Sequence, residues 1–279
     1  MDSFHKGWAR KFSGKIAVYL ARTTRSKFML FEDGFIRSIG LGDSQLFSKV
    51  EDDIGIYYDA TGPSKLENLL NNYDFKNDSE ILKIADSAIE LIKQHQISKY
   101  NHAPIINDDY FAGSKNNKVL IIAQTKGDLS HKYGLADQFD TNDIIDFAIK
   151  ENPNAEIYLK LHPDVINDNK KSDVNIDAIK YKCKIITNDV NSISLLKYFN
   201  KVYTKTSQMG FEGLMMGCKC VCFGMPFYAG WGLTDDRVSC SRRKRNLSLE
   251  EVFAASYILY PKYHNPIKQK PSYIIDTIE

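Results

Sequence analysis

The sequence predicts an α/β protein whose second half is a doubly wound parallel sheet. Its 279 residues, 43% of them hydrophobic, suffice for one large core or two modest ones. From residue 117 onward, short apolar β-branched runs alternate with helical patterns. These runs are apolar throughout, as expected for parallel strands that helices cover on both faces. A doubly wound domain has this arrangement.

Five strands and three helices are predicted in this half. The strands are the apolar runs at 119–123, 157–161, 184–187, 202–206 and 220–223. The helices are the segments at 141–150, 193–199 and 208–216. Because strands and helices alternate, we expect the strands to run parallel.

The first hundred residues show the same alternation less regularly. We predict a helix near 13–22, a strand at 27–31, a helix starting at Pro63 and an amphipathic helix at 79–95. Residues 101–118 are polar and rich in Asn, which suits an interdomain linker. The predicted organisation is a first domain at 1–100, this linker, a second domain at 119–245, and a tail at 246–279 that starts with one helix.

The composition excludes some partners. A net charge of +2 carries no excess that would indicate nucleic acid as the partner. The basic run at 241–245 has no aromatic platform beside it, so we interpret it as a solvated, interdomain or membrane-surface segment. The longest apolar stretches, such as 119–123, fall far short of the ~20 residues of a membrane span, and the polar start lacks a signal-peptide core. We therefore expect a cytoplasmic protein.

The five cysteines contain no C-x-x-C pair. Cys218, Cys220 and Cys222 alternate, which places them on one face of a strand. A metal site would need histidines nearby, and the sequence has none there. We interpret the three as small buried hydrophobes.

Polar residues follow three of the predicted strands. Strand 119–123 leads into Gln124 and Asp128, strand 157–161 into His162 and Pro163, and strand 202–206 into Ser207. Ligands of an open parallel sheet bind outside the carboxyl ends of its strands. A carboxylate, an imidazole and a hydroxyl are therefore expected at one edge.

These residue types fit a nucleotide phosphate. Ser207 can cap the helix at 208–216 while the free N–H groups of its first turn bind a phosphate, to which His162 and the nearby Lys160 can donate. The alternative is an ordinary N-cap and a hydrogen-bonded loop histidine. Glu212 lies too late for a capping box, so it either accepts from a ribose diol or stabilises the helix dipole.

Two further segments carry candidate binding residues. The loop at 224–232, with Tyr228 and Trp231, either covers a base or sugar or fills core. Glu32 and Asp33 follow strand 27–31, and Gly34 permits a sharp turn that exposes both carboxylates for proton transfer, unless this is an ordinary acidic turn. No dinucleotide, Walker, zinc-protease or G-x-S-x-G motif is present, so the dehydrogenase, NTPase, zincin and hydrolase classes have no support.

Together these strings resemble the capsule polysaccharide biosynthesis family, the KpsC-type β-Kdo glycosyltransferases. The matching motifs are Glu32 to Gly42 (EDGFIRSIGLG), Gly55 to Ala60 (GIYYDA), Gln124-x-x-x-Asp128, His162 to Val165 (HPDV), Thr206 to Glu212 (TSQMGFE) and Pro226 to Thr234 (PFYAGWGLT). The resemblance runs from about Gly7 to Pro266. It implies a GT-B-like pair of Rossmann-like domains with parallel sheets that transfers Kdo, an acidic keto sugar, from CMP-Kdo to a glycolipid or saccharide acceptor.

The resemblance also implies a role for each candidate residue. Asp128 is the nucleophile of a retaining double displacement, with Gln124 beside it. His162 and Ser207 hold the CMP phosphate, and Pro163 and Lys160 lie next to His162 in the nucleotide site. Glu212 holds the ribose. Glu32 and Asp33 handle the acceptor or act in base catalysis, and their sequence element also resembles one in bacterial CMP-sialic acid transferases. The predicted acceptor or sugar contacts are Arg37, Tyr228 and Trp231.

No metal or other cofactor is expected, because the single phosphate of CMP can be neutralised by imidazole, hydroxyl and helix N–H donors. Family modules have more chain before the Gly7-Trp8 element, so we expect a shortened N-terminal domain. Two functions remain open: an active Kdo transferase, or a non-catalytic CMP-Kdo-binding or assembly subunit. The implied partners are CMP-Kdo, a lipid-linked or saccharide acceptor and other capsule assembly proteins, and a lipid acceptor would place the protein peripherally at the inner membrane.

Overall fold

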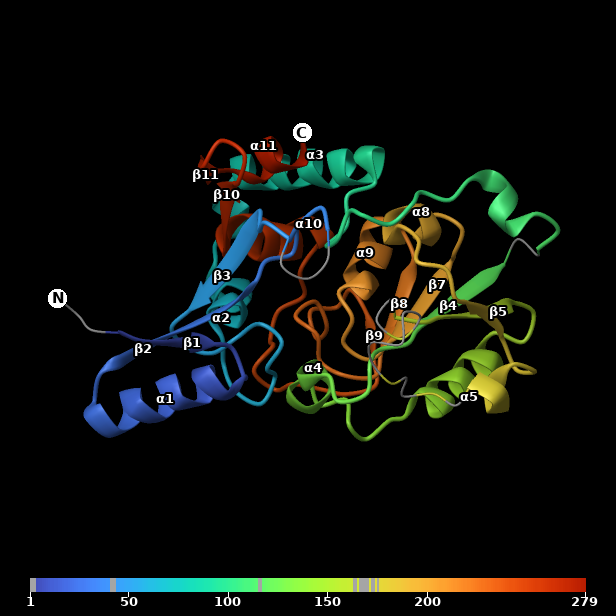
Figure 1. The fold of residues 1–279 in the computed structure, drawn as a ribbon, viewed down its shortest axis with the longest axis horizontal. Helices are drawn as coiled ribbons and strands as arrows, with labels where there is room; N and C mark the ends of the chain where they lie inside the picture. Colours follow the sequence, from blue (N-terminus) through green and yellow to red (C-terminus); the bar gives the residue numbers. More distant parts are fainter. Residues whose placement is uncertain are drawn as a thin grey trace. The chain divides into compact units, whose positions relative to one another are not determined.

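The computed structural model describes residues 4–40, 44–114, 117–162, 165, 171, 174 and 176–279. The chain folds into two compact units (Figure 1). The first unit combines residues 1–102 with 242–279, and the second comprises residues 103–241. The predicted tail at 246–279 is therefore part of the first unit, and the second unit ends at Ser241 and not at residue 245.

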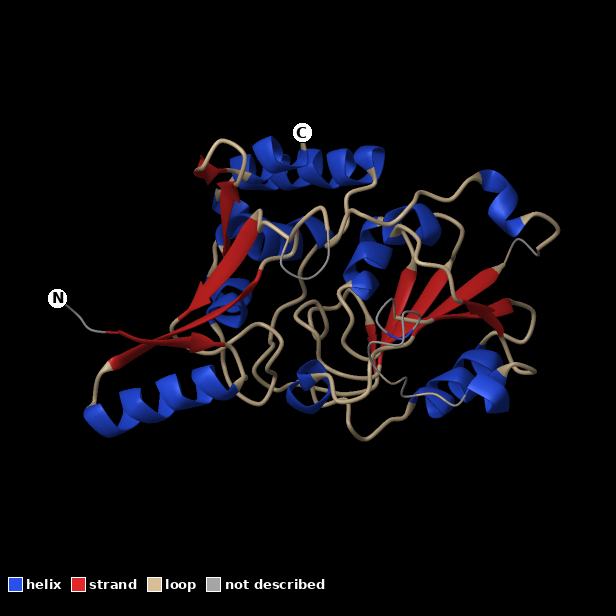
Figure 2. Cartoon of the chain, in the orientation of Figure 1, coloured by secondary structure: helices blue, strands red, loops and turns tan. Residues whose placement is uncertain are grey.

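The second unit contains the predicted parallel sheet. Its strand order is β6-β5-β4-β7-β8-β9, and every neighbouring pair is parallel (Figure 2). The strands are β4 (Lys118–Ile122), β5 (Glu156–Lys160), β6 (Lys184–Ile186), β7 (Lys201–Thr204), β8 (Lys219–Cys222) and β9 (Asp235–Asp236). All five predicted strands are confirmed, and the apolar runs of β4, β5, β7 and β8 are largely buried, whereas the terminal strand β6 is partly exposed.

Helices lie on both faces of this sheet. They are α4 (Leu129–Tyr133), α5 (Thr141–Glu151), α7 (Ile176–Ile179), α8 (Ser192–Leu196) and α9 (Met209–Met215). Helix α5 begins with a capping box between Asp140 and Asp143. Its buried residues pack in one hydrophobic cluster with strand residues that include Val119, Ile121 and Leu159.

The predicted linker at 101–118 belongs largely to the second unit. It contains a short 3₁₀ helix, η2 (Asp108–Phe111), and its last residue opens β4. Phe111 is buried against Tyr158 and Phe199, with ring centroids 5.3 and 5.5 Å away. The linker prediction was wrong for the residues from 103 onward, which belong to the second unit. It relied on the polar composition of the segment, and that composition does not indicate that Phe111 packs in the core.

The sheet of the first unit is mixed. Its order is β1-β2-β3-β10-β11, from β1 (Phe4–Trp8), β2 (Lys27–Asp33), β3 (Ser48–Asp52), β10 (Pro261–Asn265) and β11 (Lys270–Ser272). Only β1 and β2 run parallel, and the other three pairs are antiparallel. The expectation of a parallel sheet in this unit therefore holds for one pair, because β3 runs antiparallel to β2 and the C-terminal strands β10 and β11 add two further antiparallel pairs.

The helices of the first unit largely follow the prediction. They are α1 (Phe12–Thr24), α2 (Lys65–Asn72), α3 (Ser79–His95), α10 (Leu249–Phe253) and α11 (Ile274–Ile278), with the 3₁₀ turn η1 (Phe75–Asn77) and the π-helical segment η3 (Ala254–Leu259). Helix α3 matches its predicted range. Helix α2 is capped by the Ser64 hydroxyl, which accepts from the Glu67 N–H, so Pro63 precedes the cap and does not open the helix.

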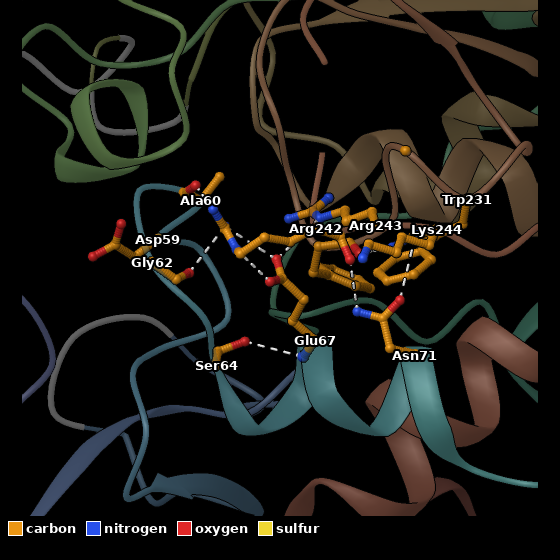
Figure 3. A network of polar contacts seen from close by, with 12 residues as sticks. Asp59, Ala60, Gly62, Ser64, Glu67, Asn71, Trp231, Arg242, Arg243 and Lys244 are labelled. Atoms are coloured by element: carbon orange, nitrogen blue, oxygen red, sulfur yellow. Dashed lines mark hydrogen bonds and ion pairs between the residues drawn. The ribbon is translucent and has the colours of Figure 1, made fainter. Parts of the chain in front are cut away.

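The basic segment after Ser241 packs on helix α2 (Figure 3). Arg242 Nε donates to Glu67 Oε1 over 2.7 Å, and Arg243 Nε lies 3.4 Å from Glu67 Oε2. Arg242 also donates to the carbonyls of Ala60 and Gly62, and Asn71 donates to the Arg242 carbonyl. The Arg242–Arg243 segment is therefore held within the first unit, whereas the sequence predicts a solvated, interdomain or membrane-surface segment.

Glu67→Ala is expected to destabilise the first unit by about 3 kcal/mol, because it removes a buried carboxylate that two arginines share. The Arg243 side chain is only 3% exposed, so the change removes a carboxylate partner from a buried guanidinium. Chemical denaturation measures the loss, with Glu90→Ala on the exposed face of α3 as the matched control. Equal stability of the two variants would contradict this role for the ion pairs.

The cysteine interpretation is confirmed for the strand residues. Cys218, Cys220 and Cys222 are buried, and the Sγ atoms of Cys220 and Cys222 lie 3.8 Å apart, as expected for one face of β8. Within the described ranges, no group of three or more His, Cys, Asp or Glu residues is arranged to hold a metal ion. Among the described helices, none combines the length and hydropathy needed to cross a membrane.

Candidate functional site

The predicted donor-site residues lie at one edge of the second sheet. Strands β5, β4 and β7 are adjacent and parallel, so their carboxyl ends share an edge. His162, Gln124 with Asp128, and Ser207 follow these three strands respectively. The sheet topology therefore brings together groups separated by some eighty residues of sequence.

Gln124 joins the ends of β4 and β7. Its Oε1 accepts from the Thr206 backbone N–H over 2.9 Å, and its Nε2 lies 3.1 Å from Thr206 Oγ1. The hydroxyls of Ser130 and Thr206 are 2.9 Å apart, which closes the network. Gln124 is buried and fully engaged, so it fixes the relative position of the loops that carry Asp128 and Ser207.

Asp128 is the N-cap of the short helix α4. Its Oδ1 accepts from the Ser130 N–H over 2.8 Å. The residue is half-buried. One carboxylate oxygen is thus oriented by the helix start, which leaves the other oxygen for a further contact.

Lys160, the last residue of β5, is a buried lysine. The residue is 6% exposed, and its Nζ has no hydrogen-bond partner among the described residues. Burial lowers the pKa of Lys160, and the charge of Asp189 opposes that shift. His162 follows, half-buried, whereas Pro163 lies outside the described residues.

Ser207 lies two residues before α9, as expected for a residue at the carboxyl end of β7. The prediction that it caps the helix was wrong, because the N-cap is Gln208. The Ser207 hydroxyl accepts from the Met209 N–H over 3.2 Å. Its carbonyl accepts from the buried Tyr228 hydroxyl over 2.6 Å. A Cβ on Gly210 would collide with that same hydroxyl, so the glycine permits the contact that fixes Ser207.

Glu212 lies on the same helix and is buried. Its Oε2 accepts from the Ser192 hydroxyl over 2.5 Å, which ties α9 to the first residue of α8. The Ser192 hydroxyl thus orients the buried carboxylate, whose place in the first turn of α9 is compatible with both a ribose contact and stabilisation of the helix dipole.

The predicted sugar contacts of Tyr228 and Trp231 need correction. Both residues have 0% exposure. Trp231 Nε1 donates to the Phe227 carbonyl over 2.9 Å, and burial raises the pKa of Tyr228 well above its usual range. The loop at 224–232 folds its aromatic rings inward, so these two residues support the site from within the core and offer no ring face to a ligand.

The first unit collects a second set of polar groups at the ends of β1 and β2. Glu32 and Asp33 are the last two residues of β2 and are half-buried, so the prediction of a turn that exposes both carboxylates was wrong. Trp8 Nε1 donates to Glu32 Oε1 over 3.1 Å, and the same oxygen accepts from the Asp33 N–H. Arg37 Nε donates to Asp33 Oδ2 over 2.7 Å, and its guanidinium stacks 5.6 Å from the Tyr100 ring centroid. Arg37 therefore orients Asp33, which is a different contact from the acceptor contact predicted for it.

Burial raises the pKa of Glu32, and the positive charges of Lys99 and Lys11 partly offset the shift. The backbone bonds from the Arg37 and Ser38 N–H groups to the Lys99 carbonyl hold that lysine in the same region. A carboxylate whose pKa is raised is a stronger base than an ordinary carboxylate, which suits it to accept a proton.

Sequence reasoning missed four residues that complete these networks: Ser130, Thr206 as a hydrogen-bond partner, Ser192 and Lys99. The first three lie within two residues of a strand end or helix start, so the rule that found Ser207 could have found them. Lys99 follows α3 in an irregular segment, and no local pattern marks it.

An open parallel sheet with polar side chains gathered at its carboxyl edge defines a ligand-binding α/β protein. The family described as "Capsule polysaccharide biosynthesis protein" matches residues 8–118 and 107–263. The chain belongs to this family.

Named relatives agree with this assignment. "Capsule polysaccharide modification protein LipA" of Neisseria meningitidis serogroup B is 41% identical over 283 residues, covering 98% of this chain and 40% of LipA. "Lipopolysaccharide-processing protein LpsZ" of Rhizobium meliloti is 40% identical over 234 residues, covering 83% of this chain and 53% of LpsZ. The chain thus spans about half or less of the length of these curated relatives.

Two solved structures share the whole fold. The Thermosulfurimonas dismutans KpsC β-Kdo 2,4 transferase superposes with a TM-score of 0.90 at 46% identity, covering 98% of this chain and 85% of that chain. The KpsC β-Kdo 2,7 transferase of the same organism gives a TM-score of 0.72 at 32% identity, covering 98% and 82%. Both units of the present chain therefore have counterparts in these structures.

Proposed function

We propose that this chain is a glycosyltransferase that transfers Kdo from CMP-Kdo to a saccharide or glycolipid acceptor in capsule or surface polysaccharide biosynthesis. The observation that carries the proposal is the likeness to the KpsC β-Kdo 2,4 transferase over 98% of the chain. The polar groups at the edge of the second sheet support it, because they match a donor with a single phosphate.

The first half-reaction uses residues of the second unit. The free oxygen of Asp128 attacks the anomeric carbon of Kdo while the bond from that carbon to the CMP phosphate oxygen breaks. His162 and Ser207 bind the phosphate, and Glu212, oriented by Ser192, binds the ribose. The products are a Kdo ester on Asp128 and free CMP.

The second half-reaction transfers the sugar to the acceptor. An acceptor hydroxyl attacks the same carbon, the ester bond to Asp128 breaks, and a base removes the hydroxyl proton. We assign this base to Glu32, whose buried carboxyl has a raised pKa, with Asp33 and Arg37 positioned beside it. Two inversions at one carbon give overall retention.

Intact mass spectrometry tests the proposal. Protein incubated with CMP-Kdo should gain the mass of one Kdo residue, and Asp128→Ala should not. An acceptor should discharge the adduct and sustain CMP release. CMP binding that depends on His162, without adduct or turnover, would instead identify a non-catalytic binding subunit.

Lys160→Met is expected to weaken CMP binding about tenfold, because a charged donor to a phosphate or carbonyl oxygen contributes roughly this much. Lys160→Arg, which keeps the charge, is the matched control. Isothermal titration with CMP measures both variants. Unchanged affinity in Lys160→Met would remove the residue from the donor site.

The lowered pKa of Lys160 also predicts the pH dependence of CMP binding. An anionic ligand stabilises the protonated amine, so the pKa rises on binding and the complex takes up a proton. CMP affinity should therefore fall as the pH rises from the pKa of Lys160 in the free protein to its higher pKa in the CMP complex. The measurement belongs above about pH 7, where a monoester phosphate with a second pKa near 6 is fully ionised, and Lys160→Met should abolish the proton uptake.

A further inference from the structure

Helix α1 presents two opposite faces of different character. Its buried residues are Gly14, Ala17 and Ala21, which face β1 and β2. Its outer face exposes large apolar side chains, and these are Phe12 (80% exposed), Ile16 (41%), Tyr19 (66%) and Leu20 (37%). At ~100° per residue, positions 12, 16, 19 and 20 form one stripe opposite the buried small residues.

The packing of α1 on the sheet fixes this orientation. A Cβ on Gly14 would collide with the Ala9 carbonyl, and one on Gly7 would collide with the Ser13 carbonyl. Helix and strand thus approach more closely than any larger residue allows. Figure 1 shows α1 lying along β1 and β2, with no other described element of its unit beyond it. The apolar stripe is therefore held rigidly outward.

The chain segment that carries the stripe has basic but no acidic residues. Residues 3–31 contain no Asp or Glu, and they contain Lys6, Arg10, Lys11, Lys15, Arg22, Arg25 and Lys27. Arg10 pairs with Asp59. Lys15 and Arg22 flank the stripe, and neither forms an ion pair with a carboxylate of the described residues. An exposed apolar stripe with a basic flank is the pattern of a helix that lies in a membrane interface.

We propose that the outer face of α1, defined by Phe12, Ile16, Tyr19, Leu20, Lys15 and Arg22, docks on an anionic lipid bilayer. The apolar side chains insert at the level of the headgroups, and the basic flank contacts lipid phosphates. Charge complementarity selects this occupant, because a second copy of the chain would bring two basic faces together. The inference is independent of the proposed transfer reaction.

Vesicle co-sedimentation tests the docking. The full chain should bind vesicles that contain phosphatidylglycerol and should bind pure phosphatidylcholine vesicles far less. Binding should weaken as salt shortens the screening length from about 30 Å at 0.01 M to about 3 Å at 1 M. The double variants Phe12→Ser with Tyr19→Ser, and Lys15→Glu with Arg22→Glu, should each reduce binding at least about tenfold.

The second unit offers a matched control. Tyr181 is 88% exposed and lies between Lys180 and Lys182, so Tyr181→Ser and the double Lys180→Glu with Lys182→Glu should bind as the parent protein does. Thermal unfolding of all variants should be unchanged, since every altered side chain is exposed. Absence of binding to anionic vesicles, or retained binding in both α1 variants, would overturn the proposal. Loss of a dimer or of a protein complex in the Phe12 and Tyr19 variant, without loss of vesicle binding, would assign the face to a protein partner instead.

Discussion

Asp128→Asn is expected to abolish adduct formation and to reduce Kdo transfer at least about 10³-fold, which corresponds to roughly 4 kcal/mol of activation free energy. The amide lacks the negative charge that attacks the anomeric carbon. It keeps the acceptor oxygen that caps α4 through the Ser130 N–H, because Asn and Asp are equally good N-caps. The variant therefore separates chemistry from folding.

Two companion variants sharpen the test. Asp128→Ala should lose the same activity and in addition about 1 kcal/mol of stability, since the cap is gone. Asp137→Asn, an exposed carboxylate in the same unit, should leave transfer and adduct unchanged. Substantial transfer by Asp128→Asn would place the nucleophile elsewhere or indicate direct displacement.

Glu32→Gln is expected to slow transfer to the acceptor by about 10²–10⁴-fold, the range for loss of a general base. The adduct on Asp128 should still form and should accumulate, because the first half-reaction needs no base. The Gln side-chain oxygen retains the acceptor for Trp8 Nε1 and the Asp33 N–H, so the local geometry is preserved. Rapid-quench mass spectrometry of the adduct and product measures both steps.

The raised pKa of Glu32 gives this variant a second signature. A group whose pKa is higher in the folded state binds its proton more tightly there, so its contribution to stability is lost as the pH rises from the usual value of 4.5 through the folded-state value. Glu32→Gln should therefore flatten the decline of unfolding free energy above pH 4.5.

Paired variants identify the base. Glu51→Gln on the neighbouring strand β3, whose carboxylate pairs with Lys49 and Lys262, should transfer Kdo normally. If Asp33→Asn, and not Glu32→Gln, accumulates the adduct, then the base is Asp33 and Glu32 only positions it.

The second unit was readily predicted because its signals are local. A parallel strand covered on both faces must be apolar at every position, as in the run at 119–123, so the sequence marks it without knowledge of its neighbours. The residue that follows such a strand then falls at the ligand-binding edge, which is why Asp128, His162 and Ser207 could be assigned to one edge from the sequence alone.

The sheet of the first unit could not be predicted in the same way. Strands β3 and β10 are separated by some two hundred residues. Buried and more exposed positions largely alternate in both, but the buried positions of β3 include the polar residues Ser48 and Asp52, so the sequence of β3 shows no apolar pattern. Alternation indicates a half-buried strand but does not specify its partner. The two Pro-containing strands β10 and β11 also contradict strand propensity, and they lie where the sequence predicted only a helix and a tail.

The sequence by itself determined the α/β class, strands β4 to β8 of the second unit and the identity of the polar groups at its edge, because these depend on patterns within a few residues. It did not indicate the two-residue strand β9. Only the tertiary structure decided that Tyr228 and Trp231 are core, that Phe111 anchors the expected linker, and that the basic run at 242–243 binds Glu67. Burial and charge pairing depend on which distant segments come into contact, and a local sequence pattern does not specify those contacts.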